Sequence, residues 1–353
     1  MMPFASQVAE PLRRQVQFNC HLSDAHHGRA YSLCIYLLKM REFYRWEQNL
    51  AFGDAIPKGP LGEWLHEREQ YWESIEDKDY QDLGLAGQRY RAFDNYPLNQ
   101  QLMGHGLLYS GGLCGSKPHF FLAELEQHEQ RQGIDVYVVG HELARELTAP
   151  PALSLQRTIY LRRESLQRML WEKLEEWGWQ DEQRAIARAV AHFPFQRSRD
   201  EALEAMTSME IPVLLQHEIG EVLTGDALGQ DWEGLLSALP HSRTELQLRA
   251  IRDHLVDCRY TLPMLLNEQR DASLHVYFAN LAGMRRALFP SLSNAYRAWL
   301  DGDGGKHLHE AIAHGAAHWQ KQAEQALDIY RTDGTQGTIL EQRLARREEQ
   351  LAF

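Results

Sequence analysis

The spacing of apolar residues predicts that most of this chain is helical. From residue 163 onward, apolar side chains recur every three or four positions. In the first such segment they are Leu166, Met169, Leu170, Leu174 and Trp177. This spacing matches the 3.6-residue period of a helix, and short Gly- and Pro-rich breaks separate the segments. The second half is therefore expected to be a helical bundle rather than an alternating α/β sheet.

A small α+β element is predicted within the first half. Runs of β-branched and aromatic residues at 134–139 and 158–161 predict strands. The segments 121–130 and 141–147 are expected to be helical. The predicted fold is mainly α, a helical bundle with a small α+β element inserted in the first half.

The rest of the first half is also expected to be helical. Ser23 and Asp24 are suitable N-cap residues for a long helix that runs to about Leu50. Three regions follow from these patterns. They are an N-terminal helical region with the α+β element (1–162), the helical bundle (163–330) and a charged C-terminal tail or helix (331–353).

Charge and composition exclude several classes of protein. The sequence has 37 Lys and Arg against 49 Asp and Glu, a formal net charge of −12, and no long basic stripe. Nucleic acid and an anionic membrane are therefore not expected as partners. The sequence has no apolar stretch long enough to span a bilayer and no apolar secretory signal region. Four cysteines without a C-x-x-C motif fit a reducing compartment, so a cytoplasmic protein is predicted.

Common nucleotide-binding and hydrolase motifs are absent. The segment GGLCGSK at 111–117 superficially resembles a phosphate-binding loop, but Ser116 separates Gly115 from Lys117 and Pro118 follows. There is no G-x-G-x-x-G after a strand and no G-x-S-x-G. We therefore expect no nucleotide cofactor.

The segment 211–223 (IPVLLQHEIGEVL) places carboxylates on an apolar helix face. Pro212 suits its first turn, Glu218 follows two leucines of the inward face by three and four residues, and Glu221 lies one turn further. An ionised carboxylate in such a position is costly unless it is paired, hydrogen-bonded or metal-bound. With His217 alongside, the two glutamates are spaced to reach one cation.

A second helix, predicted at 246–266, offers a matching pair. His254 and Asp257 border its apolar face one turn apart, and Pro263 is expected to kink or shorten it. Helical bundles can aim such pairs at an interior metal, and helices close in sequence tend to pack together. The predicted ligands are His217, Glu218, Glu221, His254 and Asp257.

These ligand types predict a helical metal-binding protein. Carboxylate and imidazole ligands suit iron or manganese, and zinc is a nearby variant. An open coordination position would permit an iron-dependent oxidoreductase, although the sequence leaves open whether the protein is an enzyme. The paired E-x-x-H motifs of a di-iron site are missing at these positions, which argues against two metals.

Two other functions compete with this hypothesis. The alternative is a non-enzymatic interaction or scaffold protein, whose buried carboxylates pair with arginines such as Arg249, Arg252, Arg259 and Arg285. A third hypothesis is a small-molecule binding protein with a pocket between the α+β element and the bundle. The partner is thus an unknown small molecule or protein.

Three further positions carry potential ligands. Glu47 is either a helix-end residue in solvent or a third buried carboxylate. The cluster CHLSDAHH at 20–27 has possible zinc ligands without a standard spacing. Glu310, His314 and His318 share one helix face, which is expected to be a solvated surface able to capture zinc or nickel adventitiously.

Four strings in the first half resemble an uncharacterised bacterial family known only as a domain of unknown function. They are CHLSDAHHGRAYSLCIYLLKMREFYRWE, KPHFFLAELEQHE, GHELARELTAPPA and RTIYLRRESLQRMLWEKLEEW. The resemblance implies no activity, cofactor or catalytic residue.

Overall fold

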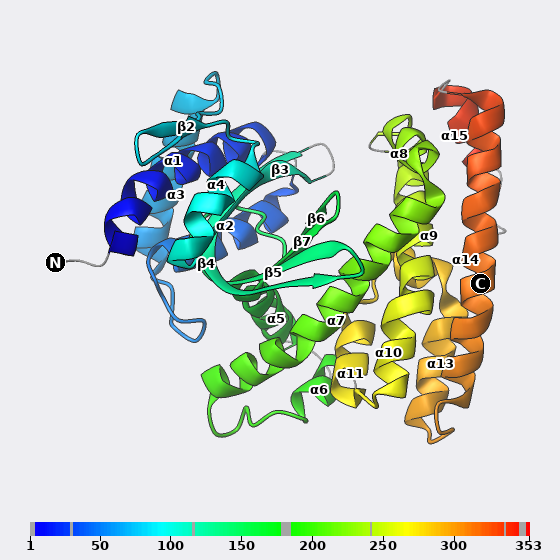
Figure 1. The fold of residues 1–353 in the computed structure, drawn as a ribbon. Coiled ribbons are helices and arrows are strands. Elements are labelled where there is room, and N and C mark those ends of the chain that lie inside the picture. Colours follow the sequence, from blue (N-terminus) through cyan, green and yellow to red (C-terminus); the bar gives the residue numbers. More distant parts are fainter. Residues whose placement is uncertain are drawn as a thin grey trace. The chain divides into compact units, whose positions relative to one another are not determined.

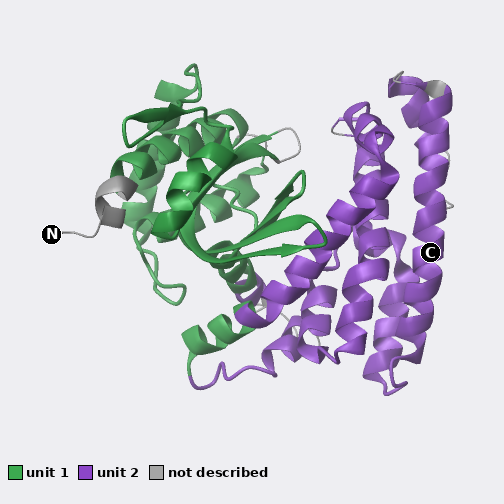
Figure 2. Cartoon of the chain, in the orientation of Figure 1, with its two compact units in different colours: residues 1–172, 198–207 green, residues 173–197, 208–353 purple. Residues whose placement is uncertain are grey.

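The protein folds into two compact units (Figure 2). The computed structural model describes residues 4–28, 31–114, 117–177, 185–240, 242–334, 337–345 and 351–353. Unit 1 comprises residues 1–172 and 198–207, and unit 2 comprises residues 173–197 and 208–353. The fold is mainly α with a sheet-containing element in the first half, as the sequence predicts (Figure 1). Among the described residues, no helix is long and apolar enough to cross a membrane.

Unit 1 surrounds a five-stranded sheet with helices. The helices are α1 (Phe4–His27), α2 (Leu33–Glu47), α3 (Lys58–Ile75), α4 (Asn95–Leu102), the 3₁₀ turn η2 (Met103–His105) and α5 (Arg163–Trp177), whose last residues belong to unit 2. The strands are β1 (Leu83–Leu85), β2 (Gln88–Tyr90), β3 (Leu107–Cys114), β4 (Lys117–Arg131), β5 (Ile134–Arg145), β6 (Ala152–Leu155) and β7 (Thr158–Arg162). The first residues of α7 (Arg199–Leu228) complete the unit.

The sheet order is β3-β4-β5-β7-β6, and β1 and β2 form a separate hairpin. All neighbours are antiparallel except β5 and β7, which are parallel. Their register pairs Asp135 with Thr158 at one end and Val139 with Arg162 at the other. Because β5 continues beyond this last pair, its charged final residues extend past the end of β7.

Alternating residues of β4 fill two separate cores. Phe120 and Leu122 belong to the cluster that includes residues of α1, while Phe121 and Ala123 belong to the cluster on the other face. Helix α1 packs against β4 and β5 (Figure 1). The period of two in the strand thus buries both faces of the sheet.

The helices predicted at 121–130 and 141–147 are wrong, because both segments belong to strands β4 and β5. These strands are joined by a tight turn in which Gln132 and Gly133 both have positive φ, of 52° and 71°. Such a turn matches the twist of a hairpin. Pairing with neighbouring strands therefore overrides the helix-favouring Glu, Gln and Leu residues of 121–130.

The long helix predicted from Ser23 to Leu50 is also corrected. The structure has Ser23 and Asp24 buried near the end of α1, and a new helix, α2, begins at Leu33. Both carboxylate oxygens of Asp24 lie 3.0 Å from the backbone nitrogen of Leu147, which follows β5. Asp24 therefore bonds the end of the sheet rather than the start of a helix.

Every regular element in the described part of unit 2 is a helix. Beyond the main part of α7, it contains α6 (Ala185–Val190), α8 (Gln230–Ser237), α9 (Arg243–Val256), the π-helical turn η3 (Asp257–Thr261), α10 (Leu262–Asn267), α11 (Asp271–Asn280), α12 (Gly283–Leu288), α13 (Pro290–Leu300), α14 (Lys306–Asp333) and α15 (Gly337–Ala345). Helix α14 packs against α8, α9, α13 and α15. The fully buried side chains of Trp232, Leu255, Phe289 and Trp319 mark this core.

Two prolines occupy different kinds of position in unit 2. Pro212 lies inside α7, which begins at Arg199, so its predicted place in a first turn is corrected. Pro263 lies in the first turn of α10, directly after the π-helical turn η3, and the helical residues run without a gap from Arg243 to Asn267, so the helix predicted at 246–266 changes its hydrogen-bond pattern but does not end at Pro263. Because proline has no N–H, the helix cannot continue there with regular hydrogen bonds.

Candidate functional site

Part of the predicted metal site comes together in unit 2. A Cβ on Gly220 would lie 2.7 Å from Tyr260 Cδ2 and 2.8 Å from Val256 Cγ1. This glycine therefore permits close packing of α7 against the end of α9 and the π-helical turn η3. The close packing places His217 Nδ1 3.1 Å from Asp257 Oδ1, at the start of the π-helical turn. Such turns are frequent at functional sites.

His217 lies between two carboxylates. Its Nε2 is 3.6 Å from Glu221 Oε1, in addition to the contact with Asp257. Burial lowers the pKa of His217, but the hydrogen bonds with Asp257 and Glu221 outweigh this effect and hold the pKa well above its ordinary value. The raised pKa favours the protonated imidazole, in which both ring nitrogens can donate.

Arginines occupy the remaining positions around these carboxylates. Arg252 Nη2 donates to Glu221 Oε1 at 3.2 Å. Asp257 Oδ2 accepts hydrogen bonds from Arg285 Nη2 and from the Tyr277 hydroxyl, the latter at 2.8 Å. Burial raises the pKa of Asp257, but Arg285 brings it below its ordinary value. Arg252 and Arg285 are two of the four arginines that the alternative hypothesis names as partners for buried carboxylates.

Glu218 and His254 have different surroundings. Burial, followed by the charge of Glu221, raises the pKa of Glu218 to about 7. His254 Nε2 lies 2.8 Å from the carbonyl oxygen of Arg285, and its ring stacks on Trp319 with 4.8 Å between centroids. Burial lowers the pKa of His254 to about 4. His254 is therefore a neutral residue of the core.

The part of the chain that the structure describes has no group of three or more His, Cys, Asp or Glu arranged to hold a metal ion. Of the five predicted ligands, His217, Glu221 and Asp257 form one cluster, and its charges are compensated by arginines. Metal binding there, by iron, manganese or zinc, stays a prediction.

The other candidate ligands take part in ordinary polar contacts. Glu47 accepts hydrogen bonds from Arg68 Nη2 and Trp64 Nε1, so it is a paired carboxylate. Arg68 also donates to His21 of the 20–27 cluster, at 2.7 Å from Nε2. On α14, His318 Nε2 lies 3.2 Å from the carbonyl oxygen of Leu351, while Glu310 and His314 are exposed.

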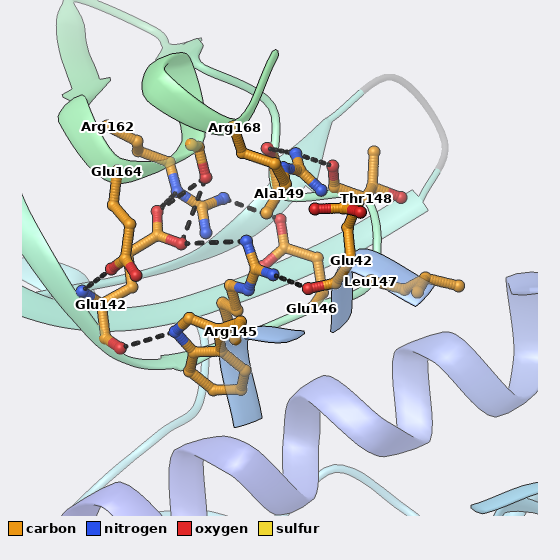
Figure 3. Close-up of polar contacts among 12 residues, drawn as sticks. Glu42, Glu142, Arg145, Glu146, Leu147, Thr148, Ala149, Arg162, Glu164 and Arg168 are labelled. Atoms are coloured by element: carbon orange, nitrogen blue, oxygen red, sulfur yellow. Dashed lines mark hydrogen bonds and ion pairs between the residues drawn. The ribbon is translucent and has the colours of Figure 1, made fainter. Parts of the chain in front are cut away.

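A second group of buried charges lies in unit 1, where β5 and β7 end (Figure 3). Arg162 Nε donates to Glu142 Oε1 at 2.6 Å, and its Nη1 donates to Glu146 Oε1 at 2.8 Å. Arg145 Nη1 lies 3.7 Å from Glu142 Oε2. These four side chains are at most 4% exposed. We call them the sheet-end network.

Neighbouring elements hold this network in place. Helix α5 follows β7 without a loop, and this places Ser165 Oγ 2.9 Å from Glu142 Oε1. Glu164, in the first turn of α5, accepts the backbone N–H of Glu142 at 2.6 Å. From α1, Gln17 exchanges two hydrogen bonds with the backbone of Arg145. Burial raises the pKa of Glu142, but Arg162 and Arg145 bring it below its ordinary value.

Several polar atoms beside this network lack a hydrogen-bond partner among the described residues. They are Arg145 Nε, Glu146 Oε2, Arg162 Nη2 and His119 Nδ1. Buried polar atoms are nearly always satisfied in native proteins, and exceptions are often explained by water, an ion or a function.

A cavity of about 210 Å³ is lined in part by two of these residues, His119 and Glu146. We call it the sheet cavity. Its described lining consists of Ser23, Asp24, His27, Gly28, Tyr31, Lys117, Pro118, His119, Glu146, Thr148 and Pro150. All of them belong to unit 1.

The hydroxyl donors of the sheet cavity are already engaged. Ser23 Oγ donates to the carbonyl oxygen of Pro118 at 2.5 Å. The hydroxyls of Tyr31 and Thr148 lie 2.7 Å apart and bond each other. Lys117 Nζ lies 5.2 Å from the centre of the Tyr31 ring, in a cation–π contact.

The uncommitted groups of the cavity are mainly acceptors. Glu146 Oε2 has no partner among the described residues. His119 Nε2 lies 3.1 Å from Ser110 Oγ, and its Nδ1, which donates or accepts according to the ring tautomer, has no partner among the described residues. Burial raises the pKa of Asp24 well above its ordinary value, and the Leu147 N–H only partly offsets that rise. The sheet cavity is therefore suited to a ligand that donates hydrogen bonds and carries positive charge.

Sequence reasoning missed the sheet-end network because it assigned a helix to 141–147. A usable signal was present: the strand predicted at 134–139 is followed by Gly140 and His141 with no N-cap residue between them. A continuing strand would have put Glu142 in a sheet. Its partner Arg162 lies 20 residues away, and no local pattern identifies that pair.

Comparison with known proteins identifies a family. The N-terminal domain of a family of unknown function, DUF6866, matches residues 11–162, and the C-terminal domain of the same family matches residues 167–348. No curated protein and no solved structure matches the chain. Since the two models together span most of its length, the chain belongs to the DUF6866 family of unknown function.

Proposed function

We propose that unit 1 binds a small molecule with a positively charged amine in the sheet cavity. The observation that carries this proposal is the pair of carboxylates among the lining residues: Asp24 accepts the Leu147 N–H, and Glu146 Oε2 has no partner among the residues described. An ammonium group offers three N–H donors and a positive charge. The proposal develops the small-molecule hypothesis of the sequence analysis, with the site placed within unit 1 alone.

Electrostatics favours a cationic ligand here. A buried carboxylate without a cation at hydrogen-bonding distance is costly, and this cost raises the pKa of Asp24. A bound ammonium stabilises the ionised form of Asp24 and removes part of that cost. Because binding favours the ionised carboxylate, we expect affinity to fall as the pH drops through the pKa of Asp24.

The volume limits the part of the ligand that is enclosed. A cavity of about 210 Å³ corresponds to roughly seven waters. This space fits an ammonium group with a short aliphatic stem. Lys117 is the only lysine or arginine in the described lining, and its ammonium lies over the Tyr31 ring.

The test is a calorimetric titration of the full chain with three matched probes. These are butylammonium chloride, 1-butanol and sodium butyrate, which share a carbon chain and differ in charge. We expect only the amine to bind. Variants Asp24→Asn and Glu146→Gln should weaken amine binding by roughly ten- to a hundredfold, because each removes a charge-assisted hydrogen bond.

The controls separate binding from folding. The amide side chain introduced by Asp24→Asn keeps an oxygen for the Leu147 N–H, so this variant should retain the fold. Glu63→Gln makes the same charge change at an exposed position of α3, outside the cavity lining, and should leave affinity unchanged. Equal binding of all three probes, or no binding of the amine to the folded wild-type chain, would refute the proposal.

A further inference from the structure

The sheet cavity has a positive charge in its wall as well as two carboxylates. Lys117, the first residue of β4, lines the cavity, and its Nζ has no ion-pair partner among the residues described. The contact given for this ammonium is the one with the Tyr31 ring, which also lies 5.3 Å from Lys39 Nζ. An aromatic ring attracts a cation but supplies no counter-charge. The charge of Lys117 is therefore not compensated by a described carboxylate.

The charge of Lys117 acts on the cavity itself. His27 belongs to the same lining, and burial, followed by the charge of Lys117, lowers its pKa. Burial also lowers the pKa of His119, to about 4. Lowered pKa values favour neutral imidazoles. At neutral pH, Lys117 is therefore the cation of the described lining.

The negative charges of the cavity are held apart from this cation. Glu146 is 3% exposed, and its Oε1 accepts Arg162 while its Oε2 has no partner among the described residues. Asp24 accepts the Leu147 N–H. Neither carboxylate forms an ion pair with Lys117, although all three side chains line one space of about 210 Å³. The cavity thus offers an acceptor side and a separate cationic side.

From this separation of charge we propose that the ligand of the sheet cavity is a small amino acid, with its ammonium at Glu146 and Asp24 and its carboxylate at Lys117. This inference rests on the proposed function, because it uses the same ammonium position and names the class of amine. A simple alkylammonium would bring a second cation near Lys117. An amino acid gives each charged side of the cavity a partner and brings in no net charge.

The size of the cavity and the nature of its cation agree with this class of ligand. Glycine, β-alanine and 4-aminobutyrate have no more non-hydrogen atoms than the roughly seven waters that the cavity could hold. A lysine ammonium is a compact charge on a flexible stem, so it can leave the Tyr31 ring to meet a carboxylate. The three compounds differ in the spacing of their charges, and affinity should therefore vary along the series.

The carboxylate contact is expected to be the weaker of the two. Lys117 is only partly buried, whereas Glu146 and Asp24 are buried. Partly exposed charge pairs contribute less and are screened by salt. An anion without an ammonium should not bind, because it would meet two carboxylates. The advantage of an amino acid over an amine should shrink at high ionic strength.

The experiment is a calorimetric titration of the full chain with glycine, β-alanine and 4-aminobutyrate. Each is compared with the amine that lacks its carboxylate, which is methyl-, ethyl- or propylammonium. We expect the best amino acid to bind about tenfold more tightly than its matched amine at low salt, because it adds a charge-assisted contact.

The variant Lys117→Met keeps an unbranched side chain and removes the charge. It should weaken amino-acid binding by about tenfold and leave the matched amine bound as tightly as before or slightly more tightly, because a repelling charge is gone. A purely structural role of Lys117 would weaken both ligands together. Lys58→Met removes the same charge at an exposed position of α3, outside the cavity lining, and should change neither affinity.

The outcomes separate this inference from the proposed function. If amines bind but no amino acid exceeds its matched amine, the carboxylate position is refuted while amine binding stands. If Lys117→Met weakens both ligands equally, or if Lys58→Met has the same effect as Lys117→Met, the inference also fails. If neither amines nor amino acids bind the folded wild-type chain, the proposed function fails and this inference fails with it.

Discussion

The two units bury their charges in different ways. In unit 1, Arg162 and Glu142 are fully buried, and the sheet-end network leaves several polar atoms without partners among the described residues. In unit 2, Asp257 is buried as well, but its partners Arg285 and His217 keep 28% and 22% of their side chains exposed. One network is almost fully buried and adjoins a cavity, and the other is partly exposed.

This difference in exposure explains why loss of a carboxylate–arginine pair is expected to cost more stability in unit 1 than in unit 2. Water can stabilise Arg285 and His217 if their partner is lost, whereas nothing comparable reaches Arg162. In unit 2, the buried carboxylate of Asp257 has three partners. In unit 1, Glu146 Oε2 and His119 Nδ1 have no partner among the described residues, and both residues line the sheet cavity. For this reason the proposed ligand site lies in unit 1, although the sequence pointed to unit 2.

The largest expected effect is that of Arg162→Met. It would leave Glu142 and Glu146 buried without their shared cation, and it should reduce the free energy of unfolding by about 3–5 kcal/mol. Urea denaturation measures the loss, with hydrogen exchange of β5 and β7 assigning it to unit 1. Arg163→Met is the control, because Arg163 is partly exposed and should cost under about 1 kcal/mol. Equal losses in the two variants would show that burial of the Arg162 pair adds nothing to the cost of losing it.

The next largest effect concerns Glu210, a buried carboxylate of unit 2 whose Oε1 has no partner among the described residues. Burial raises its pKa from 4.5 to about 7. Between these values the folded state binds the proton more tightly than the unfolded state, so stability falls as the pH rises through this window. Glu210→Gln should therefore gain about 1–3 kcal/mol relative to the wild type at pH 8 and little at pH 4.5.

Urea denaturation at both pH values tests the Glu210 prediction. Glu233→Gln on α8 serves as the control, since Glu233 is exposed and its substitution should give no pH-dependent difference. A Glu210→Gln gain that is equal at both pH values would contradict the assigned cause.

Gly220→Ala tests the close packing that forms the unit 2 network. The added Cβ would meet Tyr260 and Val256 at under 3 Å, so we expect a loss of about 2 kcal/mol. The same substitution at Gly225, also on α7, meets nothing within 4 Å. Gly225→Ala should be neutral or stabilising by up to about 1 kcal/mol. Thermal unfolding compares the two, and similar values would mean that α7 adjusts without cost.

The smallest expected effect is that of Arg285→Met. Asp257 would keep His217 and Tyr277 as partners, and the arginine it loses is partly exposed. We expect a loss of about 1 kcal/mol, well below that of Arg162→Met. Denaturation at low and high salt measures it, and the loss should diminish with salt. A loss as large as that of Arg162→Met would erase the contrast between the units.

The sequence was informative about the candidate site only in part. The sequence placed His217, Glu221 and Asp257 among its predicted metal ligands, and in the structure His217 contacts both of these carboxylates. It did not reveal that His254 stacks on Trp319, because the buried face of α9 extends beyond the apolar stripe to include Gln247 and His254. The boundary between the two family domains lies between residues 162 and 167, whereas unit 1 extends to residue 172 before the chain enters unit 2. The domain boundary in the sequence and the boundary between compact units therefore differ by several residues.

By itself, the order of residues determined the helical character of the chain and its negative charge. Helical character depends on the spacing of nearby residues and net charge depends on composition, so both can be predicted without knowledge of the fold. Only the tertiary structure decided that residues 121–130 form a strand, that Arg162 bonds Glu142, and that Asp24 and Glu146 line one cavity. The reason is that strand pairing and the neutralisation of buried charge depend on partners distant in sequence, such as Gln17 and Arg145, which are 128 residues apart.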